Sequence, residues 1–174
     1  MPSTDLPPSE DAPQHLRSLI RHFVDLRDGI HGGETSRQGK EARFAEAVEH
    51  LDPYARQALS EMNRTLLLDT GTVTATGLVR APDGGLEAAW TLTWAEQRDA
   101  QVEPVTIKAF YGRSFHHPHL GGGTVGVWPL NVFNEQDAAA ELPTLRSIAA
   151  ADLHNLVFQR DYRIVPAITA GATS

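Results

Sequence analysis

The sequence predicts an α+β domain in which a four-stranded antiparallel meander follows N-terminal helices and is covered by a C-terminal helix. Three observations favour this class. Apolar residues recur at helical spacing between residues 14 and 66, alternate at strand spacing between residues 72 and 111, and return to helical spacing after residue 143. Because short turns separate the expected strands, antiparallel pairing of neighbours is the simplest topology.

The length suits one domain, since a chain of 174 residues can bury a core without disulfide bonds or a structural metal. The formal net charge is −7 and no cluster of Lys or Arg interrupts it, so nucleic acid is not expected as a partner. Cysteine is absent, which excludes disulfides, thiolate metal sites and a cysteine nucleophile. No apolar run reaches the ~20 residues of a membrane span and no signal-peptide pattern is present, so we expect a soluble cytoplasmic protein without a membrane partner.

The first part of the chain predicts a flexible lead followed by a helix. Residues 1–13 hold four prolines and no basic residue, a composition typical of a flexible segment, and we place the domain itself at residues 14–160. A helix starting near residue 14 is indicated by its apolar stripe, which consists of Leu16, Leu19, Ile20, Phe23 and Val24. The polar side chains are expected in solvent, and these are Arg17, Arg21, Asp25 and Asp28 together with His15 and His22.

Two more helices are expected before the sheet, one over residues 38–51 and one beginning at residue 52. Asp52 offers an N-cap and Pro53 suits the first turn of a new helix. Since proline fits a fresh start better than a helix interior, a bend is predicted there.

The strands are expected at residues 72–80, 86–94, 105–111 and 124–128. A Pro-Asp-Gly-Gly turn joins the first two into a hairpin with one buried face, and a polar linker leads to the third. A connection rich in histidine and glycine precedes the fourth strand, and a loop over residues 129–142 follows it. The last helix starts near Pro143 and covers the sheet. Residues 161–174 form a tail that adds one short strand or docks on a neighbour.

Several of these segments resemble the ubiquitin-conjugating enzyme fold and its inactive relatives. The matching residues are Pro104-Val105-Thr106-Ile107, Phe115-His116-His117-Pro118-His119-Leu120, Gly123-Thr124-Val125 and Leu142-Pro143-Thr144-Leu145. In that family the turn reads His-Pro-Asn, and a cysteine three residues after the later glycine carries ubiquitin. Here Gly126 stands at the cysteine position, so thioester transfer is excluded because it requires a thiolate. The resemblance therefore implies an inactive relative used for binding.

A non-catalytic assembly or accessory subunit without a cofactor is the leading interpretation, and its partner is another protein or a second copy of the chain. Loops usually run over the surface, so apolar loop residues indicate a binding patch. The expected contact residues are Trp128, Leu130, Val132 and Phe133 in the loop, and His116, His117 and His119 in the turn. The alternative is that Trp128 and Phe133 fold under the last helix as core.

A rival interpretation is a small metal-binding protein or metalloenzyme. His117 precedes Pro118 and is held extended, so His119 can point to the same side and the two imidazoles can bind a divalent first-row metal. Asp152 or His154 from the last helix would supply a third ligand, which leaves a position for hydrolytic or oxygen chemistry. In the competing structural interpretation, one imidazole forms a hydrogen bond with the backbone of its own turn and the other imidazoles lie at the surface.

Overall fold

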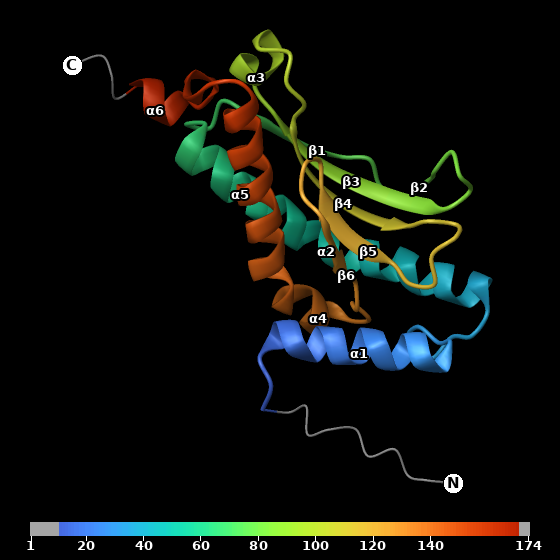
Figure 1. Ribbon diagram of the computed structural model, residues 1–174. Coiled ribbons are helices and arrows are strands. Elements are labelled where there is room, and N and C mark those ends of the chain that lie inside the picture. The colour runs from blue at the N-terminus through green and yellow to red at the C-terminus, as the bar shows by residue number, and fades with distance from the viewer. Residues whose placement is uncertain (1–10, 171–174) are drawn as a thin grey trace, which may run out of the picture.

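The α+β class predicted from the sequence is confirmed (Figure 1), and the computed structural model describes residues 11–170. The elements, in chain order, are α1 (Gln14–Asp28), α2 (Arg37–Leu66), β1 (Thr72–Ala75), β2 (Val79–Arg80), β3 (Leu86–Thr93), α3 (Ala95–Asp99), β4 (Val105–Tyr111), β5 (His119–Gly122), β6 (Val127–Pro129), α4 (Glu135–Ala140), α5 (Leu142–Gln159), the 3-10 helix η1 (Tyr162–Ile164) and α6 (Pro166–Ala170). Most of the lead expected at residues 1–13, and the last four residues of the tail, lie outside the described range.

The strands form one antiparallel sheet in the order β1-β3-β4-β5-β6, and β2 also pairs with β3. The strand expected over residues 72–80 is therefore split. Thr76 causes the interruption, because its hydroxyl oxygen accepts the Ala89 N–H at 3.0 Å and so replaces a backbone carbonyl in the ladder. The hairpin with one buried face is confirmed, since alternate residues of β3 are buried.

The fourth strand, expected over residues 124–128, is only partly confirmed, because β6 includes its last two residues and β5 was not expected. Two short strands, β5 and β6, lie on either side of residues 123–126, and the glycines of residues 121–122 belong to β5. Space explains this placement: a Cβ at Gly122 would lie 2.5 Å from the Val125 side chain and 3.1 Å from that of Ile148 on α5. Glycine thus lets the strand, its turn and the covering helix approach one another.

The core lies between one face of the sheet and the helices α2 and α5 (Figure 1). From the sheet it takes the inward residues of β3 and β4, and α5 covers it as the sequence predicts. The largest fully buried side chains are Trp90, Trp94, Tyr111, Phe44, Leu51, Leu59, Leu67, Leu92, Ile107, Leu120, Leu130 and Leu145. No helix among residues 11–170 is both long enough and apolar enough to cross a membrane.

The bend expected at Asp52 is wrong, because α2 is one helix of 30 residues that contains Pro53. Its buried residues continue on both sides of the proline, so packing against the sheet and α5 holds it together. Asp52 is not a cap. Its carboxylate accepts the indole N–H of Trp90 at 2.9 Å and so ties the helix to β3.

The tail after α5 packs on the domain as helical turns, and the described part contains no strand there. Ile164 and Val165 are buried, and the indole N–H of Trp94 donates to the Ile164 carbonyl at 2.6 Å. The boundary predicted at residue 160 therefore does not separate the tail from the core.

Candidate metal centre

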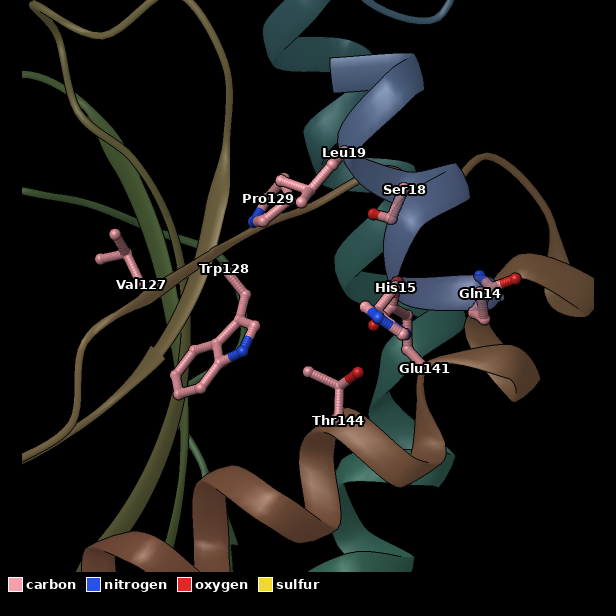
Figure 2. A pocket seen from close by; sticks show the side chains of 9 residues that line it. All are labelled: Gln14, His15, Ser18, Leu19, Val127, Trp128, Pro129, Glu141 and Thr144. Carbon is pink, nitrogen blue, oxygen red and sulfur yellow. The ribbon is translucent and has the colours of Figure 1, made fainter. Parts of the chain in front are cut away.

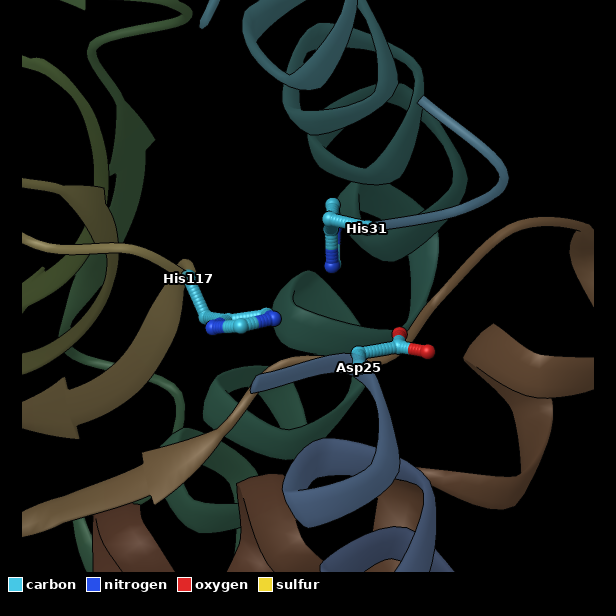
Figure 3. A group of neighbouring side chains, drawn as sticks. All are labelled: Asp25, His31 and His117. Atoms are coloured by element: carbon cyan, nitrogen blue, oxygen red, sulfur yellow. The ribbon is translucent and has the colours of Figure 1, made fainter. Parts of the chain in front are cut away.

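Three polar side chains from distant parts of the sequence meet beside α1. Asp25 comes from the last turns of α1, His31 from the connection to α2, and His117 from the connection between β4 and β5. One ligand atom from each lies within 4.8 Å of those of the other two. Figure 3 shows the His31 and His117 rings directed into one space, with Asp25 beside it on α1. They are exposed by only 6%, 1% and 2%, respectively, so water does not solvate them freely.

A tight turn places His31 in the cluster. His31 and Glu34 exchange two backbone hydrogen bonds, at 2.9 and 3.0 Å, around Gly32 and Gly33. Both glycines have positive φ, 57° and 80°, which two-residue turns of this kind require. A Cβ at Gly32 would also lie 2.6 Å from the Phe133 ring. Two glycines are thus needed to aim this imidazole inward.

The connection that carries His117 is fixed by an arginine and a proline. Arg37, at the start of α2, donates to the carbonyls of Tyr111, Gly112 and Phe115 at 3.1–3.2 Å. The Pro118 carbonyl accepts the Leu130 N–H at 3.2 Å. These bonds hold both ends of the segment, so the His117 ring is presented rigidly.

One hydrogen bond defines the state of His117 in the absence of a cation. Its Nε2 lies 2.9 Å from the Ile30 carbonyl oxygen, which only accepts, so Nε2 carries the ring proton and Nδ1 does not. A cation bound at Nε2 would take the place of that proton.

The cluster contains buried polar atoms without partners. Among the described residues, five buried side-chain N or O atoms lack a hydrogen bond, and three of them belong to Asp25 (Oδ2), His31 (Nδ1) and His22 (Nδ1). Each such atom costs about 1–3 kcal/mol of folding stability when nothing compensates it. Their concentration at one point is what a bound ion would explain.

Two further imidazoles border the cluster. The His22 ring centroid lies 4.9 Å from that of His117 and 5.5 Å from that of His119. Burial, followed by the neighbouring imidazoles, lowers the pKa of His22 to about 4, and burial and nearby positive groups lower the pKa of His31 to about 3. Burial also lowers the pKa of His117 and His119. At neutral pH these rings are therefore neutral, which is the form that binds a metal.

The groups around Asp25 affect its charge in opposite directions. Burial raises the pKa of Asp25, while Arg21, His117 and Lys40 favour its ionised form. Lys40 is itself buried, on the first turns of α2, and it acts on His31 as well. A positive charge this near opposes a cation, so Lys40 sets a limit on the affinity of the site.

The solvated face expected on α1 is present except at two residues. Arg17, Arg21, Asp28 and His15 are exposed, whereas Asp25 is buried and His22 is half-buried. Asp25 is the only buried residue of this helix, and His22 faces the histidine cluster. The apolar side chains of Leu16, Phe23 and Leu26 are exposed instead. His22 and Asp25 lie against the cluster, and the Asn131 side chain donates to the Ser18 carbonyl at 3.0 Å, which attaches this side of α1 to the domain.

The third ligand expected from α5 does not join His117. Asp152 is fully buried, but its carboxylate accepts the backbone N–H groups of Thr106 and Thr124, each at 2.8 Å. His154 is exposed and lies beside Phe158. His119 stacks on Phe110 with centroids 5.9 Å apart and belongs to none of the three-ligand groups found among the described residues.

The expected partner surface is only partly present. Leu130 and Val132 are buried in the core, so their assignment to a binding patch is wrong. Trp128 is half-buried against the core, and Phe133 is half-buried between His31 and the Arg21 guanidinium, 4.3 Å from the ring centre. His116 is exposed.

Fold and site together define an α+β protein with a buried cluster of imidazoles and one carboxylate. No family model, no curated protein and no solved structure matches this chain.

Proposed function

We propose that this protein binds one divalent first-row metal ion through Asp25, His31 and His117. The observation that carries the proposal is the convergence of three buried ligand groups, two of which contain a polar atom without a partner. Imidazole nitrogen and carboxylate oxygen are the donors that zinc and its neighbours take in proteins without thiolates. His22 is not one of the three converging groups, but its ring centroid lies 4.9 Å from that of His117 and its Nδ1 has no partner, so it is the nearest candidate for a fourth ligand after a side-chain rotation.

The depth of the cluster supports a structural role for the ion over a catalytic one. All three ligand residues are buried, whereas a catalytic ion keeps one position open to substrate. The ion would join three segments that are separate in the sequence, namely α1, the His31 turn and the β4–β5 connection. Metal binding in such a site contributes directly to folding stability.

The test compares metal binding by the chelator-treated protein and by matched histidine variants. Cobalt(II) is titrated and followed by visible absorption, and zinc(II) by calorimetry. We expect one ion per chain, and we expect His31→Ala and His117→Ala each to weaken binding by at least about tenfold. His116→Ala and His154→Ala remove exposed imidazoles and serve as controls.

A third variant, Asp25→Asn, keeps the shape of the side chain. It therefore tests the site even if the alanine variants fail to fold. It removes the negative charge, so it should weaken binding while the circular dichroism spectrum is retained. Equal affinity in His31→Ala, His117→Ala and the controls would overturn the proposal, as would the absence of any binding by the folded wild-type protein.

A second candidate, an accessory subunit that pairs with a second copy of itself, is favoured by the exposed side chains of Leu16, Phe23 and Leu26. In an antiparallel pair of α1 helices, Leu16 of one copy would lie opposite Leu26 of the other, as a two-fold interface requires. The resemblance to inactive ubiquitin-conjugating relatives belongs to this candidate, and the antiparallel meander covered by α5 supports it. Light scattering after size exclusion tests it: replacing these three residues by serine should convert a dimer into a monomer, and a monomeric wild type would contradict it.

A further inference from the structure

A second site lies on the opposite half of α1. The first turns of α1, strand β6 and the start of α5 enclose a cavity of about 300 Å³, at the lower end of the range for small-molecule sites. Figure 2 shows the Trp128 indole on one side of this space and His15, Glu141 and Thr144 on the other. None of the proposed metal ligands lines it.

Glu141 gives the cavity its charge. It is only 5% exposed, and the polar side chains that act on it are the neutral hydroxyl of Thr144, which favours the ionised form, and the Asp137 carboxylate, which opposes it. Neither Lys nor Arg lines the cavity, and no described basic residue forms an ion pair with Glu141. Burial is the largest influence on this carboxyl and raises its pKa, so nothing nearby neutralises the ionised form fully.

The position of Glu141 at the start of α5 does not by itself explain the burial of its carboxyl group. A carboxylate at a helix N-terminus is stabilised by the backbone N–H groups, and this explains why an acid is tolerated there. Its side chain, however, accepts no backbone N–H of the first turn of α5, and its hydrogen bond there is with the Thr144 side chain. The carboxyl group instead lines a cavity that holds no cation from the protein.

Trp128 provides the complementary wall. Its ring is half-buried, and the π-face of an indole attracts a cation more strongly than any other side-chain ring. Pro129 and Leu19 add apolar surface beside it, while Ser18 and Gln14 add neutral polar groups. An aromatic face opposite a carboxylate, with neither Lys nor Arg in the lining and His15 as its only nitrogen base, is an arrangement that favours an organic ammonium ion.

We propose that this cavity binds a small organic cation, a primary or quaternary ammonium, between the Trp128 indole and the Glu141 carboxylate. The proposal is independent of the metal site, because the two share no residue. Apolar substituents of the cation would contact Trp128, Pro129 and Leu19, and its charge would face Glu141. Ser18 and Thr144 would accept any N–H that the cation carries.

The test uses choline as probe and dimethylbutanol, its uncharged isostere, as the matched control ligand. Trp90 and Trp94 are buried in the core, so the fluorescence change on titration reports Trp128. We expect choline to give a saturable change and dimethylbutanol to bind at least about tenfold more weakly, the effect of one charged contact. A response to choline that persists in Trp128→Phe would overturn the proposal, as would equal binding of both ligands or no saturation below about 10 mM choline.

Two variants distinguish the loss of the Glu141 charge from a loss of folding. Glu141→Gln keeps the size of the side chain and should weaken choline binding about tenfold without changing the affinity for dimethylbutanol. Glu135→Gln, at an exposed position of α4, should leave both unchanged. Unaltered choline binding by folded Glu141→Gln protein would reject the assignment of the carboxylate.

Discussion

The His117 Nε2 atom lies 2.9 Å from the carbonyl oxygen of Ile30, so a hydrogen bond links the β4–β5 connection to the residue that precedes the His31 turn. The two residues are 87 positions apart in the chain. Since α1 buries one residue only, this bond is a main attachment of the helix and its following turn to the sheet.

The first prediction concerns this attachment. In metal-free protein, His117→Ala removes the hydrogen bond and a buried ring, and the free energy of unfolding should fall by about 2–3 kcal/mol. Amide hydrogen exchange should rise selectively in residues 14–31. His116→Ala, one position earlier and exposed, is the control. Unchanged protection of α1 in the His117 variant would show that other contacts hold the helix.

The second prediction concerns the charge beside the metal centre. Lys40→Met removes a buried positive group that opposes a cation, so cobalt(II) affinity should rise by roughly tenfold. Lys108 is the only other lysine and is exposed on β4, so Lys108→Met is a matched control. Equal cobalt(II) dissociation constants for wild type and Lys40→Met would place the bound ion away from Lys40.

The third prediction is a pH dependence at Glu141. Burial raises its pKa in the folded protein, so the ionised form is disfavoured there relative to the unfolded chain. The stabilising contribution is present below the unfolded pKa of about 4.3 and is lost as the pH rises through the higher folded value. Glu141→Gln should therefore increase the free energy of unfolding at pH 7 by about 1 kcal/mol, which corresponds to a rise in Tm of about 2–4 °C. At pH 3.5 the same substitution should not raise Tm. A gain of the same size at both pH values would contradict this explanation.

The fourth prediction concerns Asp152, whose carboxylate joins α5 to two segments of the sheet. In Asp152→Asn one amide N–H₂ must face the N–H of Thr106 or Thr124, so a buried donor loses its acceptor. We expect the free energy of unfolding to fall by roughly 2–4 kcal/mol in urea titrations. His154→Ala changes an exposed residue of the same helix and should have little effect. A stable Asp152→Asn protein that binds less metal would instead restore this residue as a ligand.

The periodicity of α1 predicted the helix but only part of its inner face, because Leu19, Ile20 and Val24 are half-buried whereas Leu16 and Phe23 are exposed. Leu16 and Phe23 indicated an apolar contact, yet Asp25 is the residue that is buried. Hydrophobic periodicity assumes that the apolar side of a helix finds the core, and it does not register a polar residue that lies beside polar groups outside the helix. His31 and His117 are the groups beside Asp25, and neither lies on α1.

The candidate site was half visible in the sequence. The restriction before Pro118 singled out His117, and its neighbour in the cluster is His31, which the sequence marked only by the pair Gly32-Gly33 after it. A histidine directly before two glycines predicts a turn, and only the three-dimensional contact makes it a candidate ligand. The continuous α2 was missed for a related reason, since a local rule about Pro53 yields to packing along the whole helix.

The bond from Trp94 to the Ile164 carbonyl bears on how this protein can be shortened. Trimming the gene after the long α5 helix would leave an indole N–H of the core without an acceptor and remove the buried Ile164 and Val165. A shortened version of the protein should therefore keep all residues up to and including Val165, and a C-terminal affinity tag should be placed after that residue.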